Sequence, residues 1–246
     1  MIEAGLRRYE QVDDEIKKEL SKKNKVTVKN VNGQRYIGCA LDEGKTIEVY
    51  GTPGNDMACY LNGGRVVVYG SCQDAVGNTM GGGEIVVHGH SGDAMGYGMR
   101  DGQIYIKDNV ACRGGIHMKE FRQMRPVLVI GENAGSFLGE YMAGGTIVLL
   151  GLNLKRGEKL FGTHCASGMH GGKIFVRGLF PKENLSDNIK VTNLDDDDVK
   201  ELKSYVRKYC KYFGVDFDYV MSKPFKKLVP ATSRPYANLY LSLIHI

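Results

Sequence analysis

The chain has 246 residues, enough for one large domain or two small ones, and a formal net charge of +5 at pH 7. Charged residues make up 25% of the chain and form no obvious stripe, so charge gives little support to a nucleic-acid-binding function. Glycine is abundant, with 33 residues against 6 prolines, which excludes a collagen-like or Pro/Gly-rich disordered chain and indicates many tight turns in an ordered fold.

The cysteines and the absence of long apolar segments bear on the location of the protein. The six cysteines are scattered and none forms a C-x-x-C pair, so the pattern does not predict a zinc ribbon or an iron–sulfur site. Single cysteines suit a reducing compartment. The first residues, MIEAGLRRYEQ, lack the apolar core of a secretory signal, and no run of about 18 apolar residues occurs. We therefore expect a cytoplasmic protein with no membrane and no nucleic-acid partner.

Residues 1–25 form a first segment, for which the sequence predicts a short helix. Val12, Ile16 and Leu20 are spaced so that they share one helical face. Asp13 or Asp14 is the expected N-terminal cap.

Residues 26–178 contain an internal repeat, in which an apolar triplet is followed two residues later by glycine. The copies read IEVYG, VVVYG, IVVHG, IYIKD, VLVIG, IVLLG and IFVRG, starting at Ile47, Val66, Ile85, Ile104, Val127, Ile147 and Ile174. The first four copies start 19 residues apart, and the later spacings of 23, 20 and 27 indicate insertions in loops. Asp108 stands where the other copies have glycine, and a weaker copy precedes the series at residues 26–30.

A second element keeps phase with these triplets. A glycine pair precedes most of them, and before the pair lie a small residue, two spacers and a large apolar residue, as in Gly77 and Met80. The glycines are expected to let the backbone turn between faces. The predicted structural turn residues are Gly51, Gly64, Gly70, Gly83, Gly89, Gly131, Gly145, Gly151, Gly172 and Gly178.

Such a repeat predicts a solenoid, because one coil cannot bury its own apolar face and stacked coils can. The first and third positions of each triplet are mostly β-branched and share one face of a strand, which we assign to the interior. The fold class is therefore all-β: a right-handed parallel β-helix of about seven coils of roughly 19 residues or more, with short N-terminal and C-terminal helices.

The middle positions of the triplets are then expected to point outward. These residues are Glu48, Val67, Val86, Tyr105, Leu128, Val148 and Phe175. An outward apolar stripe needs a cover, supplied either by the chain itself or by a partner subunit, and the sequence favours neither. The candidate cover is an amphipathic helix with an acidic N-terminus at Asp195–Asp198 and a stop at Gly214. Its apolar face consists of Val199, Leu202, Val206, Tyr209 and Phe213.

Residues 179–240 comprise a polar linker, this helix and a C-terminal tail. The stretch after Pro224 is basic and aromatic, and we expect it to wrap the surface or to dock on a partner. Residues 241–246, LSLIHI, match a translated frame of a common sequencing adapter and are expected to be an artefact.

No residue set predicts a catalytic, cofactor-binding or metal site. His88-x-His90 and His164-Cys165 match no known metal-ligand spacing, and Cys165 with His170 is a weak candidate for a nucleophile and its base. The isolated GxG at residues 96–98 does not open a helix after a strand, as a dinucleotide site requires.

Charged and aromatic residues in the turns are instead candidates for a partner interface, because loops on a rigid scaffold often carry binding. The longest basic insertion, HMKEFRQMRP, begins at His117 and interrupts the coil spacing. The interface candidates are Arg100, Arg113, Lys119, Arg122, Arg125 and Tyr141.

Several long motifs give the chain a family resemblance. GENAGSFLGEYMAGGTIVLLG and GTHCASGMHGG resemble the GXGXG domain that ends the large subunit of glutamate synthase. VNGQRYIG, GTPGND, GNTMGGG and GYGMRDG look like the stand-alone form of that domain, and LDDDDVKELKSYVRKYCKYFG followed by PFKKLVP is similar to its C-terminal helix and exit.

The resemblance implies a non-catalytic structural subunit in an oxidoreductase of glutamate biosynthesis and nitrogen assimilation, which makes glutamate from glutamine and 2-oxoglutarate. Its partners would be a glutaminase-type subunit and an FMN/iron–sulfur synthase subunit, with both cofactors in the partners and none in this chain. A second interpretation is a scaffold like the β-helical subunit of formylmethanofuran dehydrogenase. A third, from another class, is a free-standing β-helix enzyme or binding module, which would need clustered carboxylates on one outer face.

Overall fold

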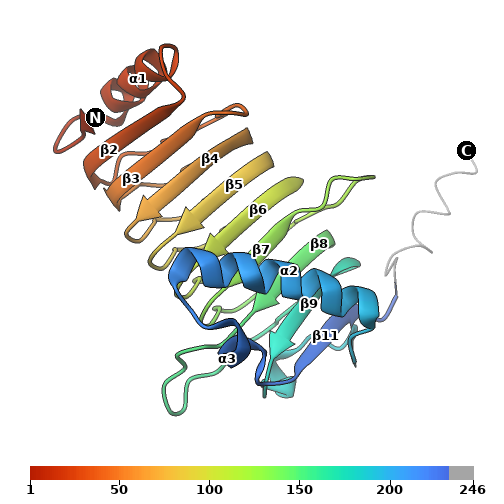
Figure 1. Ribbon diagram of the computed structural model, residues 1–246. Coiled ribbons are helices and arrows are strands. Elements are labelled where there is room, and N and C mark those ends of the chain that lie inside the picture. Colours follow the sequence, from red (N-terminus) through yellow and green to blue (C-terminus); the bar gives the residue numbers. More distant parts are fainter. Residues whose placement is uncertain (233–246) are drawn as a thin grey trace, which may run out of the picture.

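Apolar strands of one repeat pair with those of the next and build one wall of a β-helix. The computed structural model describes residues 1–232, so the expected artefactual tail at 241–246 lies outside the described residues. Eight parallel strands stack in chain order along the axis (Figure 1). They are β2 (Lys25–Asn32), β3 (Thr46–Thr52), β4 (Asn62–Tyr69), β5 (Gly81–Val87), β6 (Asp101–Ile106), β7 (Val127–Ile130), β8 (Ala143–Leu149) and β9 (Gly171–Arg177).

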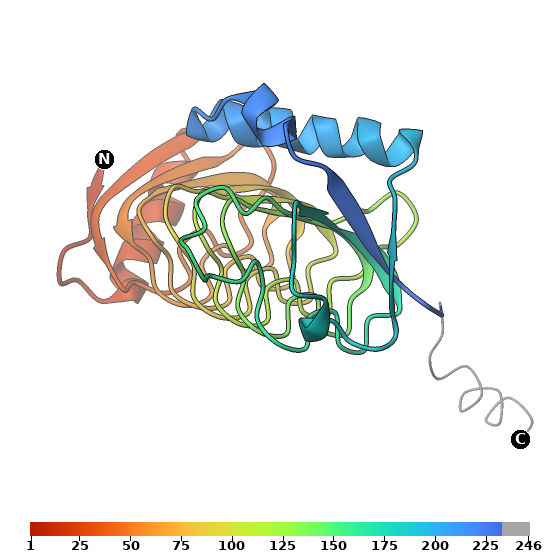
Figure 2. The same cartoon turned by 90° about the horizontal axis from the view of Figure 1, so that it is seen from below.

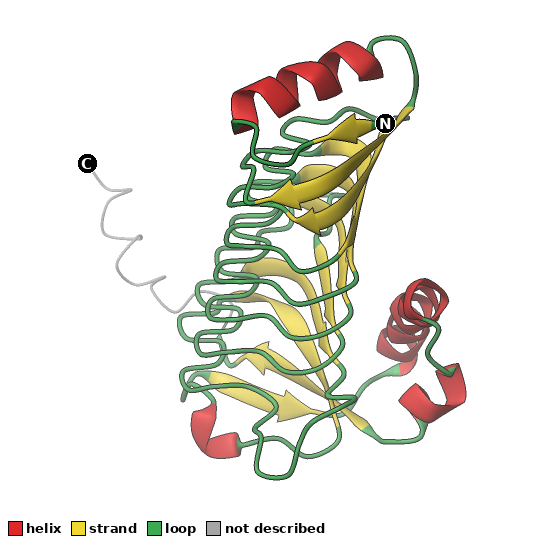
Figure 3. Ribbon diagram, turned by 90° about the vertical axis from the view of Figure 1, so that its left-hand side faces the viewer, coloured by secondary structure: helices red, strands yellow, loops and turns green. Residues whose placement is uncertain are grey.

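The remaining walls of each coil are loops and turns (Figure 3). Side chains of equivalent positions in successive coils fill the interior, which is almost wholly aliphatic, with methionines in register at Met80, Met99, Met118, Met142 and Met169. The predicted parallel β-helix is confirmed, with a coil count slightly different from the predicted seven, and β2 contains the weaker copy expected at residues 26–30.

The register of the strand at VLVI corrects one prediction. Leu128 pairs with Ile104 on one side and Ile147 on the other, so the coil spacings at this point are 24 and 19 residues, not 23 and 20. Leu128 and Ile130 therefore lie in the interior, whereas Val127 and Val129 face outward, the reverse of the predicted assignment. The sequence offered two frames because all four residues of VLVI are apolar and all four are buried.

The N-terminal end of the β-helix is covered by α1 (Tyr9–Leu20), as Figure 1 shows. Val12, Ile16 and Leu20 pack into the main core, as predicted. The predicted caps are wrong: the helix begins after Arg8, whose backbone N–H donates to Gln11 Oε1 at 3.3 Å, and Asp13 and Asp14 lie inside the helix. A short strand, β1 (Ile2–Glu3), extends the sheet in parallel beside β2.

The C-terminal end is closed by chain that returns to the sheet. After the short 3-10 helix η1 (Lys182–Asn184) come β10 (Ile189–Thr192) and, later, β11 (Phe225–Pro230). Strand β11 pairs antiparallel with both β9 and β10, which ends the parallel stack. The tail after Pro224 was expected on the surface or on a partner, and its first residues instead become the last strand beside β9.

Between β10 and β11 lie α2 (Asp196–Phe213) and the short α3 (Phe217–Met221). Helix α2 crosses the outer face of the sheet over its C-terminal half, and the strands nearest the N-terminus are left without a helix (Figures 1 and 2). Gly214 ends α2 with a left-handed φ of 68°, as predicted. None of the helices in the described residues is long and apolar enough to cross a membrane.

Candidate functional site

Each coil passes one corner through three residues with positive φ, separated by single residues. The triads are Tyr36/Gly38/Ala40, Asp56/Ala58/Tyr60, Ala75/Gly77/Thr79, Ala94/Gly96/Gly98, Arg113/Gly115/His117, Phe137/Gly139/Tyr141 and His164/Ala166/Gly168. Backbone hydrogen bonds join equivalent residues of neighbouring coils, for example from the N–H of Gly115 to the carbonyl of Met95 at 2.7 Å. The turn therefore repeats as a continuous corner along the solenoid.

The middle member of each triad is buried and small, and at Gly77 and Gly115 the reason is steric. A Cβ on Gly77 would lie 2.7 Å from Ile104 Cδ1, and one on Gly115 would lie 2.6 Å from Ile147 Cδ1. These contacts are closer than carbon atoms tolerate. The small residues that the sequence showed in phase with methionine are thus the centres of these turns.

The outer members of the triads project outward and include large side chains. L-residues in the left-handed region cost about 1–2 kcal/mol each. The aromatic and basic residues at these positions concentrate toward the C-terminal coils: Arg113, His117, Phe137, Tyr141 and His164. We call these side chains and their neighbours the turn corner.

Three of the six predicted interface residues meet at one pocket on the turn corner. Arg100, Lys119 and Tyr141 line one surface pocket of about 400 Å³ with Tyr97, His117 and His170. His117 stacks on Tyr141 with ring centroids 5.3 Å apart and meets Tyr97 edge-on at 5.8 Å.

The other three predicted interface residues do not line this pocket. Arg113 pairs with Glu140 at 3.2 Å and lies 4.9 Å from the ring centroid of Phe137. Arg122 lies over Phe121 in the exposed insertion, and the Arg125 backbone N–H donates to Asp101 at 3.1 Å. Arg113 thus lies on the turn corner beside the pocket, at the first position of its triad. Arg122 and Arg125 belong to the insertion before β7.

The ten predicted turn glycines occupy two kinds of position. Gly51, Gly83, Gly145, Gly151, Gly172 and Gly178 have positive φ. Gly64, Gly70, Gly89 and Gly131 lack it but leave no room for a Cβ, which in Gly131 would lie 1.9 Å from the carbonyl oxygen of Lys107. The sheet register makes Gly131 equivalent to Lys107 rather than to the other triplet glycines, so its close approach has a different origin.

Helix α2 covers the C-terminal half of the outward stripe. Leu202, Val206 and Tyr209 pack on a stripe of buried residues. That stripe consists of Tyr105, Val127, Val129, Val148, Leu150 and Phe175. The cover is therefore intramolecular over this half, which decides between the two alternatives that the sequence left open there.

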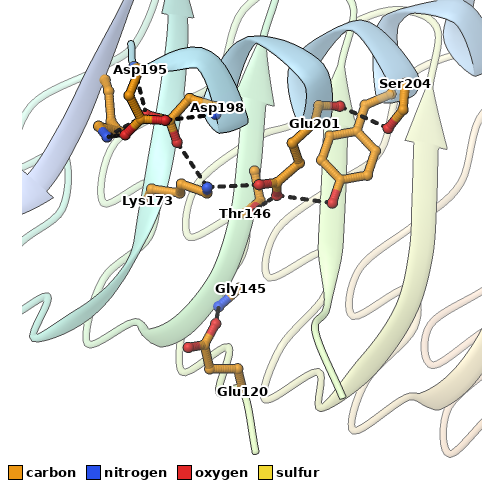
Figure 4. Close-up of polar contacts among 10 residues, drawn as sticks. Glu120, Gly145, Thr146, Lys173, Asp195, Asp198, Glu201 and Ser204 are labelled. Carbon is orange, nitrogen blue, oxygen red and sulfur yellow. Dashed lines mark hydrogen bonds and ion pairs between the residues drawn. The ribbon is translucent and has the colours of Figure 1, made fainter. Parts of the chain in front are cut away.

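Polar contacts fix the N-terminal end of α2 on the sheet (Figure 4). Lys173 of β9 donates to Asp198 at 2.9 Å and to Glu201 at 2.7 Å, and Lys227 of β11 also pairs with Asp198. Thr146 of β8 donates to Glu201 at 2.9 Å. These bonds tie the helix to three strands.

The N-terminal half of the outward face carries a different, exposed surface. Tyr50 stacks on Tyr69 at 4.6 Å and Tyr69 on His88 at 4.9 Å, and His88 meets Phe213 of α2 edge-on at 5.2 Å. Tyr50 and Tyr69 are 39% and 40% exposed. This row of rings is a second surface, which α2 contacts at its His88 end and which stays partly exposed at Tyr50 and Tyr69.

The weak candidates for chemistry occupy other environments. Cys165 is fully buried, and burial raises the pKa of its thiol, which disfavours the nucleophilic thiolate. His88 lies in the aromatic row, and His90 Nδ1 lies 3.0 Å from Ser71 Oγ. In residues 1–232 no group of three His, Cys, Asp or Glu side chains is placed to hold a metal ion.

Comparison with known proteins gives a family and a relative. The family model described as the GXGXG motif matches residues 6–233. The chain is 38% identical over 250 residues to an uncharacterized protein of Methanocaldococcus jannaschii, an alignment that covers 98% of this chain and 95% of the relative. Left-handed residues at every second position of the turn corner have the spacing that the name of the motif describes.

Proposed function

Since the chain belongs to the GXGXG motif family, we propose that it is the stand-alone structural subunit of a glutamate synthase-type complex. Such a complex would convert glutamine and 2-oxoglutarate to glutamate in the cytoplasm. This chain would dock a glutaminase-type subunit and an FMN/iron–sulfur subunit, and it would hold no cofactor itself. The match over residues 6–233 is the observation that carries the proposal.

The architecture supports a docking role. The β-helix is rigid, because its interior is close-packed and each coil is hydrogen-bonded to its neighbours. Two of its surfaces expose aromatic side chains in rows, the turn corner and the row from Tyr50 to His88. Tyrosine and arginine are enriched at the energetic centres of protein interfaces.

We assign partner contact first to the six predicted interface residues. Arg100, Lys119 and Tyr141 form one patch around the pocket, and Arg113 adjoins it. Arg122 and Arg125 lie in the basic insertion that interrupts the coils. Partner contact at the turn corner also accounts for strained backbone positions that carry large side chains.

Affinity purification of the tagged full chain from its native host tests the proposal, with mass spectrometry and an absorption spectrum of the eluate. Co-elution of a glutaminase and a yellow-brown flavin/iron–sulfur protein is the expected result. A molybdopterin enzyme in the eluate would identify the scaffold of a formylmethanofuran dehydrogenase instead. Glutamine-dependent glutamate formation by the isolated chain would contradict a structural role.

A further inference from the structure

The strained positions at the pocket carry large side chains where some other coils have glycine. His117 and Tyr141 have φ of 57° and 51°, whereas Gly98 and Gly168 occupy the same turn position in other coils. Glycine would remove a backbone cost of about 1–2 kcal/mol at each position. Strain of this kind is a reason to look for a ligand.

Two cations lie in register at this pocket. The backbone N–H of Arg100 donates to Met80 and that of Lys119 to Met99, which places the two residues at equivalent positions of adjacent coils. Neighbouring strands lie about 4.8 Å apart, so the two positive side chains start from adjacent points on one face. Like charges in such a pair are destabilising.

Elsewhere the solenoid places a carboxylate opposite a cation on the next coil. Lys25 pairs with Glu48 at 2.8 Å and Arg65 with Glu84 at 2.9 Å. Arg113 pairs in the same way with Glu140. Within residues 1–232 neither Arg100 nor Lys119 has a carboxylate within 4.0 Å, so this pair departs from the pattern.

The acidic residues nearest in sequence are engaged elsewhere. Asp101 accepts from the backbone N–H of Arg125 at 3.1 Å, and Glu120 accepts from that of Gly145 at 3.0 Å (Figure 4 shows the latter). Glu140 forms an ion pair with Arg113. None of these carboxylates lines the pocket, whose lining contains two cations and no acidic residue among the described residues.

The other walls of the pocket add hydrogen-bonding groups and aromatic faces. His170 Nδ1 lies 3.2 Å from the carbonyl oxygen of Gly168, a contact in which a proton on Nδ1 makes it the donor, and the imidazole ring forms part of the pocket wall. Tyr97 and Tyr141, 41% and 44% exposed, flank His117. Cations combined with imidazole and phenol groups are the chemistry that recognises phosphate and carboxylate groups.

We propose that this pocket binds a small oxyanion with at least two negative charges, of the phosphate or polycarboxylate class. Arg100 and Lys119 supply the charge, and His117, His170 and Tyr141 supply the walls. The volume of about 400 Å³ accommodates a small molecule. The inference concerns the pocket of the isolated chain and holds whether or not the chain docks the partners proposed above.

The test is titration of the full-length chain with pyrophosphate and, separately, with citrate, followed by calorimetry and by amide NMR shifts. Binding of at least one probe is expected, with shifts centred on Arg100, His117 and Tyr141. Affinity should fall as salt rises, because screening weakens exposed charges. Which probe binds identifies the class of oxyanion.

The decisive variant is the double substitution Arg100→Gln/Lys119→Gln. Its matched control is Lys155→Gln/Arg156→Gln, which removes one lysine and one arginine charge from an exposed loop away from the pocket lining. All four side chains belong to exposed residues, so both variants should fold as the wild type does. The first should weaken binding at least tenfold and the second less than twofold. Absence of binding by both probes, or equal affinity in the two variants, would overturn the proposal.

Discussion

Lys173 of β9 lies 2.9 Å from Asp198 of α2, and this ion pair anchors the covering helix to the end of the solenoid. Asp198 is also the last residue of a capping box, in which its backbone N–H donates to Asp195 at 2.8 Å. Burial alone would raise the pKa of the Asp198 carboxyl. Hydrogen bonds from Lys227, Lys173 and the Asp195 backbone outweigh burial and lower that pKa to about 2.

The lowered pKa predicts the pH range over which this contact stabilises the fold. A depressed carboxyl pKa contributes stability above the unfolded value of about 3.9 and loses it as pH falls toward 2. Asp198→Asn should therefore cost about 3 kcal/mol at pH 7, and the difference from the wild type should shrink between pH 4 and 2. Urea unfolding measures it. Asp197→Asn, at a 94% exposed side chain, should change stability by less than about 0.5 kcal/mol at either pH.

The intramolecular cover predicts a strong effect of charge beneath α2. Val206 is fully buried against the outward stripe, so Val206→Asp would place an unpaired carboxylate there. We expect a loss of more than about 3 kcal/mol in the free energy of unfolding, with new binding of a hydrophobic dye. Lys203→Asp makes a carboxylate on the exposed face of the same helix and should leave dye binding unchanged. Equal behaviour of the two variants would mean that α2 does not cover the stripe.

The turn corner allows backbone strain and side-chain crowding to be separated at two equivalent glycines. Gly96 and Gly115 both have φ of 69°, but a Cβ would lie 3.7 Å from Ile104 at the first and 2.6 Å from Ile147 at the second. Gly96→Ala should cost about 1–2 kcal/mol from backbone strain alone. Gly115→Ala should cost about 1–3 kcal/mol more because it overpacks the core. Similar unfolding free energies for the two variants would refute the steric explanation.

The raised pKa of Asp13, at the N-terminal end of the molecule, predicts the opposite dependence of stability on pH. Asp13 belongs to α1, its Oδ1 is buried with no hydrogen-bond partner in the described residues, and this burial raises its pKa to about 7. Because the folded pKa is raised, the wild type loses stability as pH rises from about 4 to 7. Asp13→Asn should therefore raise the melting temperature at pH 8 and change it little at pH 4. Asp14→Asn, on the exposed side of the helix, should show no such difference between the two values of pH.

How far the sequence predicted the fold can be seen at particular residues. The β-helix and the helix from Asp196 follow from periodic apolar residues, because burial imposes those periods. Which residues of β7 face the interior could not be predicted, because all four residues of VLVI are apolar and both faces of the strand are buried. The return of β11 to the sheet also escaped prediction, since pairing between Phe225 and Arg177 leaves no local signal in sequence.

The candidate site was predicted in part. Arg100, Lys119 and Tyr141 were selected as polar or aromatic turn residues, but their meeting at one pocket depends on coil stacking. His117 and His170 were missed as members of it. Positive φ is most readily inferred at glycine, so nothing in the sequence marked His117 as a left-handed residue. The shared coil position of His117 with Gly98, 19 residues earlier, is the signal that an alignment of the coils would have used.

The measurement that tests the structural role most directly is reconstitution of glutamate synthesis from separately purified subunits, with and without this chain. Glutamine-dependent glutamate formation should require the glutaminase-type subunit, the flavin/iron–sulfur subunit and this chain together, while the chain alone should be colourless and inactive. Omitting the chain should uncouple ammonia release from glutamate formation. Full coupled activity without it, or activity of the chain by itself, would contradict the account.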